Sequence, residues 1–254
     1  MKVIVTGSEG FIGKSLCQRL DRSGAEIVRV DRKLGLEASD IGLLMDGADC
    51  VFHLAAQTSV FNNDRIQIRM DNIDSFMAVA DACAERGVKL VYASSSTANE
   101  KNMTSMYGVS KRFDELYASV CCPNATGCRF HNVYGDKPRQ GTLLWHLMRD
   151  ATVTLYNCGR NTRRFTYIDD IIDGMMYAMT CDRKLVNIAN PTSSTTAEMA
   201  NIVRRYRWFN LHLSSEVREL DKEAQEVDER IFSVPLRYKT IEEGIKMIFE
   251  HEKE

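Results

Sequence analysis

Short apolar runs alternate with longer amphipathic segments through the first half of the chain. The runs are rich in β-branched residues and are bounded by turn residues, which predicts buried strands. The segments between them repeat apolar residues at intervals of three and four, which predicts helices with one buried face. The predicted strands are Met1–Val5, Glu26–Val30, Asp49–Leu54, Val88–Ala93 and Ala125–Val133, and the predicted helices are Asn72–Arg86, Tyr107–Cys121 and a helix after the first strand.

Strands that alternate with helices pair in parallel through right-handed crossovers, so we expect an α/β, Rossmann-like doubly wound parallel sheet. The second half has shorter elements. Its predicted helices are Leu143–Arg149, Asp169–Met179, Thr195–Tyr206 and Ile241–Phe249, and its predicted strands are Thr152–Tyr156 and Leu185–Ala189. Residues 210–230 are dense in charge and weakly patterned. We therefore expect a main domain of residues 1–135 with parts of 150–190. Residues 136–254 should form mainly a small C-terminal α/β substrate-binding region, interleaved with the first at the carboxyl ends of the strands.

The composition is that of an ordinary globular protein, with 254 residues, 44% apolar and 27% charged. The net charge of −2 predicts neither a nucleic-acid nor a membrane partner. No apolar run reaches the roughly 18 residues that span a bilayer, and the first predicted strand leaves no room for a signal peptide. The eight cysteines are scattered, without C-x-x-C or metal-ligand spacing. They predict reduced thiols, a cytoplasmic location and no metal site.

A glycine-rich turn follows the first predicted strand, where residues 6–13 read T-G-S-E-G-F-I-G. Gly7, Gly10 and Gly13 suit a tight turn, a close backbone approach to a ligand and close packing of helix on strand. The free N–H groups at the start of the next helix would hold a pyrophosphate. Such a turn can also be purely structural. Asp31 ends the second predicted strand, where an acid binds a ribose hydroxyl, and this favours a dinucleotide site.

A second group of polar residues follows the fourth predicted strand. Ser94, Ser95 and Ser96 come at its carboxyl end, and Tyr107 and Lys111 lie one turn apart near the start of a helix. A tyrosine and a lysine at this spacing are often ordinary surface residues. Next to a dinucleotide site, however, an ammonium that stabilises a phenolate provides an acid/base for an alcohol or sugar hydroxyl. A serine can hold the same oxygen by a hydrogen bond.

These motifs together resemble the extended short-chain dehydrogenase/reductases, in particular the NAD-dependent epimerase/dehydratase family of nucleotide-sugar enzymes. Nearly the whole chain is covered. The motifs that follow the family's order are residues 6–13, H-L-A-A-Q at 53–57, Asn72, the serines at 94–96, Y-G-V-S-K at 107–111, R-F-H-N-V-Y-G at 129–135 and T-R-R-F-T-Y-I-D-D at 162–170. R-E-L-D at 218–221 with Asp228 resembles the family's R-x-G-D…D segment.

The resemblance implies a role for each matching position. The implied catalytic residues are Ser95, Tyr107 and Lys111, with Ser96 as the alternative serine. The implied cofactor-binding residues are Gly7, Gly10, Phe11, Ile12, Gly13, Asp31, Arg32, Asp40, Ile41, Leu54, Ala55, Ala56, Asn72, Ser94, Tyr107, Lys111 and His131. The implied substrate-binding residues are Ser96, Asn132, Arg163 and Arg218. Two arginines suit a diphosphate because the guanidinium binds its oxygens bidentately. Asp31 favours NAD, whereas Arg32 and Lys33 leave NADP open.

The chain also departs from the family's pattern. The V-Y-G after the serines and about a dozen loop residues are missing, and Thr97-Ala98 replace the acid pair of sugar dehydratases. We therefore expect a nucleotide-sugar epimerase that acts through a transient keto-sugar, most simply of the UDP-sugar 4-epimerase type. A reductase, decarboxylase or dehydratase of the family, or a non-catalytic NAD(P)- or RNA-binding module, remains as an alternative. The resemblance implies a homodimer, to which Phe76, Met77, Phe113 and Tyr117 would contribute apolar surface.

Overall fold

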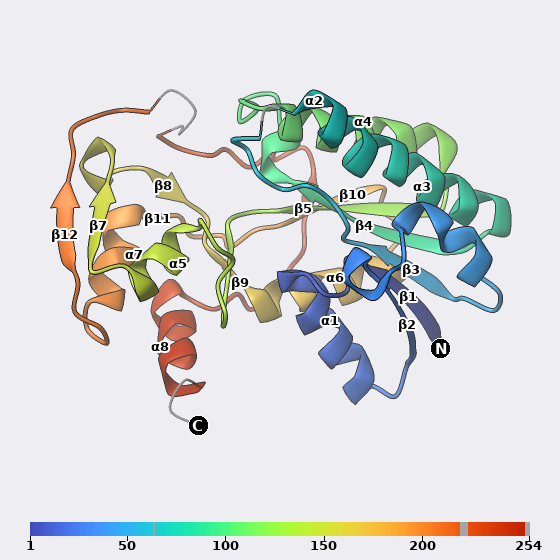
Figure 1. The fold of residues 1–254 in the computed structure, drawn as a ribbon, viewed down its shortest axis with the longest axis horizontal. Coiled ribbons are helices and arrows are strands. Elements are labelled where there is room, and N and C mark those ends of the chain that lie inside the picture. Colours follow the sequence, from blue (N-terminus) through green and yellow to red (C-terminus); the bar gives the residue numbers. More distant parts are fainter. Residues whose placement is uncertain (63, 219–222, 252–254) are drawn as a thin grey trace.

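A seven-stranded parallel sheet forms the centre of the molecule, and a smaller lobe lies at one end of it (Figure 1). The computed structural model describes residues 1–62, 64–218 and 223–251. The strand order β13-β10-β5-β4-β3-β1-β2 confirms the predicted doubly wound α/β sheet. Its strands are β1 (Lys2–Thr6), β2 (Glu26–Val30), β3 (Cys50–His53), β4 (Lys89–Ser95), β5 (Ala125–Phe130), β10 (Leu185–Ile188) and β13 (Phe232–Ser233). The order reverses between β1 and β3, which opens a crevice at their carboxyl ends.

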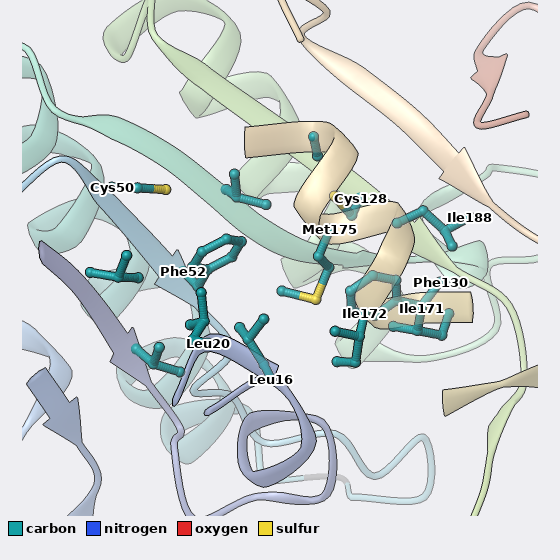
Figure 2. Packing of buried hydrophobic residues seen from close by; sticks show 14 of the residues in the cluster. Leu16, Leu20, Cys50, Phe52, Cys128, Phe130, Ile171, Ile172, Met175 and Ile188 are labelled. Atoms are coloured by element: carbon teal, nitrogen blue, oxygen red, sulfur yellow. The ribbon is translucent and has the colours of Figure 1, made fainter. Parts of the chain in front are cut away.

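Helices cover both faces of this sheet (Figure 1). One face carries α1 (Phe11–Arg22) and α6 (Ile168–Thr180), and the other carries α3 (Ser75–Arg86) and α4 (Met106–Cys121). Figure 2 shows Leu16 of α1 and Met175 of α6 packed around Phe52 of β3. On the opposite face, Phe76 of α3 is fully buried, edge-on to Tyr92 at 4.9 Å between ring centroids. Burial of these side chains is the main force that holds the helices to the sheet.

The smaller lobe is built around its own apolar core, which includes Leu147, Val153, Tyr167 and Phe209. It contains two-stranded sheets from segments far apart in the chain. Its elements are β6 (Val133–Tyr134), α5 (Leu143–Arg149), β7 (Thr152–Leu155), β8 (Thr162–Arg163), β9 (Thr166–Tyr167), β11 (Ser194–Thr195), α7 (Thr196–Val203), β12 (Asn210–Leu213) and α8 (Ile241–His251). Among the described helices, none is both long enough and apolar enough to cross a membrane.

Several predicted elements differ from those observed. The helix predicted from Asn72 is preceded by α2 (Arg65–Ile68) and a π-helical turn (Arg69–Asp74), so helical structure starts earlier. The strand predicted to reach Val133 ends at Phe130, because Asn132 has a φ of 36°. β12 and β13 were not predicted. Each is short and gains its hydrogen bonds by pairing with a distant strand, β7 or β10.

The packing of α6 on β10 leads to a test of the fold. A Cβ at Gly174 would lie 2.6 Å from Cδ1 of Ile188, which is too close for carbon atoms, whereas a Cβ at Gly42 would meet nothing nearer than Nη2 of Arg86 at 4.0 Å. We expect Gly174→Ala to lower the free energy of unfolding by roughly 1–3 kcal/mol, because the core is overpacked. Gly42→Ala is the matched control and should leave stability nearly unchanged. Urea unfolding measures both, and equal midpoints would contradict this packing.

Candidate active site

One large cavity, of about 1120 Å³, lies between the sheet and the smaller lobe. The turn between β1 and α1 lines one part of it, the end of β4 and the start of α4 line its middle, and β7 and α7 line the far part. Cavities for drug-sized ligands range from about 300 to 1,000 Å³. This cavity is therefore large enough for two extended ligands placed end to end.

The glycine turn that lines the first part of the cavity has a geometry suited to binding a phosphate group. Gly7 has a φ of +67°, and a Cβ there would lie 2.7 Å from the backbone nitrogen of Ala55. A Cβ at Gly13 would lie 2.1 Å from the Gly7 carbonyl oxygen. Gly10 caps α1 and has no side chain to accept from the first N–H groups of the helix. These N–H groups are therefore available to an anion at the positive end of the helix dipole.

Asp31 lies next to this turn, at the end of β2. Its two carboxylate oxygens accept hydrogen bonds from the backbone N–H groups of Glu9 and Lys33, each at 3.0 Å. Arg32, also at the cavity, donates to Glu37 at 2.8 Å and to Asp71 at 2.6 Å. These hydrogen bonds raise the pKa of Arg32 further above its ordinary value. The arginine is thus already paired with two carboxylates.

Tyr107 and Lys111 line the middle of the cavity from the first turns of α4. Ser105 caps this helix by accepting from the N–H of Gly108 at 3.4 Å. A Cβ at Gly108 would lie 2.7 Å from the carbonyl oxygen of Thr97, so α4 starts in close contact with the turn after β4. This contact places the phenol and the serines in one part of the cavity.

The three serines at the end of β4 have different partners. Ser94 donates to Oε1 of Glu115 at 2.6 Å, so its hydroxyl is committed to a buried carboxylate. Ser95 lies 2.8 Å from Oγ1 of Thr97 and also accepts from the N–H of Thr97. Ser96 donates to Oε1 of Gln225 at 3.4 Å, a long contact. Of the three, the hydroxyl of Ser96 is held most weakly by the described residues.

Glu115 joins α4 to the sheet. Its two oxygens accept from Nε and Nη2 of Arg129 on β5, at 2.6 and 2.7 Å, in a buried bidentate pair. Arg112 adds a contact at 3.2 Å from the edge of the pair. Bidentate geometry of this kind fixes orientation as well as distance. The network therefore sets the position of α4, and with it the position of Tyr107.

The segment at residues 223–228 crosses the site and contacts the loop after the serines. Asn102 donates to the carbonyl oxygen of Glu226 at 2.7 Å and accepts from its N–H at 2.9 Å. This reciprocal pair places Gln225 at the cavity. Neither Asn102 nor Gln225 was predicted as a site residue, because they lie in weakly patterned segments that meet only after folding. Asn102 and Gln225 both line the cavity, so the returning segment forms part of its wall.

The far part of the cavity carries the predicted arginines. The guanidinium of Arg218 lies 3.4 Å from the ring centroid of Tyr156, and both side chains line the cavity. Arg163 lines it as well and donates to the Thr162 carbonyl oxygen at 2.7 Å. Asp221, which completes the predicted R-x-G-D-like segment, lies outside the described residues. An aromatic face with two cations suits a ligand that carries both a base and phosphates.

Most of the predicted site residues line this one cavity. They are Gly7, Gly10, Phe11, Ile12, Gly13, Asp31, Arg32, Leu54, Ala55, Ala56, Ser94, Ser95, Ser96, Tyr107, Lys111, Asn132, Arg163 and Arg218.

Four predicted site residues, Asp40, Ile41, Asn72 and His131, are not among the lining residues. Ile41 is fully buried in the apolar core under α3, and its neighbour Asp40 is exposed. Asn72 is buried and holds Gln57 through two backbone hydrogen bonds, at 2.7 and 3.0 Å. Burial, together with Arg164 and Arg129, lowers the pKa of His131 to about 3, so this imidazole is neutral. Direct cofactor contact by these four residues stays a prediction.

Comparisons with known proteins identify the family of the chain. Residues 3–189 match the family model for the NAD dependent epimerase/dehydratase family. A UDP-2-acetamido-2,6-beta-L-arabino-hexul-4-ose reductase of Pseudomonas aeruginosa is 30% identical over 74% of this chain and 51% of its own length.

Two solved structures share the fold over the whole chain. MoeE5 in complex with UDP-glucuronic acid and NAD has a TM-score of 0.83 at 23% identity, covering 100% of this chain and 99% of its own. The UDP-glucuronic acid 4-epimerase from Bacillus cereus has a TM-score of 0.79 at 22% identity, with the same coverage. The Pseudomonas reductase and the Bacillus epimerase are named for different reactions, so the comparisons do not identify the reaction of this chain. The two solved structures show the fold, and the family model shows the family. The chain belongs to the NAD-dependent epimerase/dehydratase family.

Proposed function

We propose that this protein is an NAD-dependent nucleotide-sugar epimerase, most simply of the UDP-sugar 4-epimerase type. The observation that carries the proposal is the meeting of three groups in one cavity. The glycine turn lies at one part, Tyr107 and Lys111 lie beside the serines in the middle, and Arg163 and Arg218 lie at the far part. A dinucleotide and a nucleotide sugar placed end to end would bring their reactive rings together beside the phenol.

The glycine turn, the uncapped start of α1 and Asp31 fit a dinucleotide, because their backbone approach and free N–H groups suit its pyrophosphate. NAD, when bound here, would supply an acceptor and donor of hydride for a sugar carbon. Asp31 would repel a 2′-phosphate, and Arg32 is held by Glu37 and Asp71. These contacts favour NAD over NADP.

The chain's own residues would supply the acid/base chemistry. Tyr107 as phenolate would accept the proton of the sugar hydroxyl and later return it to the keto oxygen. Lys111, buried on the same face of α4, would stabilise the phenolate. A serine hydroxyl would donate to the same sugar oxygen and orient it. Arg163 and Arg218 would bind the diphosphate, with Tyr156 near the base.

A reductase is the second candidate, because the 30% identical relative is named as one. Net consumption of NAD(P)H would identify a reductase, and release of carbon dioxide a decarboxylase. A dehydratase is disfavoured since Thr97-Ala98 stand where an additional acid pair is needed.

Incubation with UDP-, dTDP- and GDP-sugars, followed by NMR of the C4 configuration, tests the epimerase. Failure to turn over any sugar of this panel would count against the proposal.

Tyr107→Phe tests the acid/base. The variant lacks the hydroxyl that exchanges the proton, so we expect turnover to fall by at least about 10²-fold. Cofactor content, measured by mass spectrometry of the purified protein, should stay unchanged because the glycine turn is intact. A Phe variant with wild-type turnover would remove Tyr107 from the mechanism.

The serine positions can be separated by a matched pair of variants. Among the described residues, the hydroxyl of Ser96 makes only the long contact to Gln225, whereas the hydroxyl of Ser95 caps the turn at Ser96–Ala98. We therefore propose Ser96, rather than the initially favoured Ser95, as the hydroxyl that meets the sugar. Ser96→Ala should lower kcat about tenfold or more with a normal melting temperature. Ser95→Ala should mainly lower the melting temperature. The reverse result would indicate that the hydroxyl of Ser95, and not that of Ser96, meets the sugar.

A homodimer is also proposed, through the outer face of α4. Val109, Leu116 and Val120 share that face and are 42%, 54% and 81% exposed. Phe113 and Tyr117 stack beside them at 5.8 Å. Phe76, which was expected to contribute, cannot do so because it is fully buried in the core.

Leu116→Glu tests this surface, because a charge in an apolar interface is costly to bury. We expect wild-type protein to sediment as a dimer and the variant as a monomer. Leu43→Glu, at a leucine that is 87% exposed elsewhere, is the control and should stay dimeric. Sedimentation of the wild type as a monomer would end the dimer proposal.

A further inference from the structure

Helix α4 carries a carboxylate one turn beyond its lysine. Oδ2 of Asp114 lies 3.0 Å from Nζ of Lys111, and the side chains are 0% and 2% exposed. Tyr107, Lys111 and Asp114 are spaced by four and three residues, so they lie along one face of the helix. The face therefore presents a phenol, an ammonium and a carboxylate in a row.

The two carboxylates of this helix are used differently. Glu115 accepts on both oxygens, from Ser94 and Arg129 among others. Asp114 accepts from Lys111 on Oδ2, while its buried Oδ1 has no hydrogen-bond partner among the described residues. A buried carboxylate kept only for stability should have both oxygens satisfied, as Glu115 does. Within residues 1–62, 64–218 and 223–251, the hydrogen bond that the Asp114 carboxylate accepts from a side chain comes from Lys111.

The environment explains what that contact does. Burial acts to lower the pKa of Lys111, but attraction to Asp114 and Tyr107 outweighs it, so the pKa of Lys111 is raised. Burial raises the pKa of Asp114 to about 6, against the attraction of Lys111. Without the carboxylate, the enclosed ammonium would tend to lose its proton.

Other polar groups lie around the pair. Tyr107 and Glu115 of α4 act on Lys111, as Lys111 does on His53 at the end of β3, and Asp114 and Glu115 act on Tyr92 of β4. Glu115 is paired with Arg129 of β5 and with Arg112. Of the neighbouring elements, the π-helical turn contributes Asn72, bonded to Ser110, and α3 contributes Asp81, bonded to Tyr117. His53 is neutral, because burial and Lys111 lower its pKa to about 3. Glu115 is compensated by its two arginines. Among the described residues, Asp114 is therefore the carboxylate whose ion pair is with Lys111 and not with an arginine.

We propose that Asp114 is a positioning residue that keeps Lys111 charged and fixed beside Tyr107. It acts through the lysine and need not touch substrate. The inference rests on the proposed function for its consequence in turnover, while the charge of Lys111 can be measured without substrate or cofactor.

The first experiment is NMR of lysine-labelled protein over a pH series. The Lys111 signal is assigned by its loss in Lys111→Arg. In Asp114→Asn, which keeps the shape of the side chain, we expect Lys111 to lose its proton at least about one pH unit lower than in the wild type, a tenfold weaker proton affinity. Asp173→Asn removes a surface carboxylate paired with Arg19 and is the matched control. An unchanged Lys111 titration in Asp114→Asn would overturn the inference.

The wild-type protein gives a second readout in case the variant folds poorly. The Lys111 signal should also shift with a midpoint near pH 6, as the neighbouring Asp114 ionises. A Lys111 signal that responds to the ionisation of no neighbouring carboxylate anywhere in the pH series would equally overturn the inference.

The third readout is the pH profile of kcat. In Asp114→Asn the lysine should lose its charge at a lower pH, so the alkaline limb of the kcat profile should move to lower pH. KM for the sugar should change little. Asp114→Glu should return the alkaline limb to its wild-type pH. A merely structural role would lower activity by one factor at every pH, and that result would count against positioning. If no sugar is turned over by the wild type, the proposed function fails while the NMR result still decides the role of Asp114.

Discussion

The geometry of the candidate site depends on one buried carboxylate, that of Glu115. It ties α4 to β5 through the bidentate contact of Arg129 and to β4 through Ser94. Removing one partner of such a pair leaves an uncompensated buried charge, which typically costs about 3–5 kcal/mol. The helix that carries Tyr107 therefore cannot rotate or slide on the sheet without breaking this network. The network gives the site its precision, whereas the apolar core gives the fold most of its stability.

The site is assembled from both halves of the chain. The first half provides the glycine turn, the serines and α4, all at the carboxyl ends of parallel strands. The second half provides the arginines and a segment that returns across the site through the reciprocal contacts of Asn102 and Glu226. β13 follows this segment and joins the edge of the main sheet beside β10. The returning segment is thereby held at both ends, by a loop amide and by a strand pairing.

The buried ammonium of Lys111 is paired with the carboxylate of Asp114, while the nearby imidazole of His53 stays neutral. His53 lies near Lys111 but is held neutral by burial and by the lysine itself. The ring is fixed by Thr6, whose hydroxyl lies 2.9 Å from Nδ1 and also accepts from the N–H groups of Leu54 and Ala55.

Local signals in the chain were sufficient for the main fold and much of the candidate site. The alternation of apolar runs and amphipathic segments predicted the parallel sheet. Gly87, the glycine at the end of α3, has a φ of 66°, which is a local feature of the same kind. The spacing of the glycines, and of Tyr107 and Lys111, also reflects the geometry of a single turn or helix. Such features depend on neighbours in sequence, so a short window contains them.

The packing and hydrogen bonding between segments far apart in the sequence were decided by the tertiary structure. Phe76 was expected at a surface but is buried against Tyr92, and Ile41 lies in the core instead of the cavity. β13 exists because β10 offers it hydrogen bonds, and Gln225 reaches the site because Asn102 holds its neighbour. The partner of each serine likewise became visible only in the folded chain. These outcomes depend on long-range packing and hydrogen bonding, which no periodicity along the sequence records.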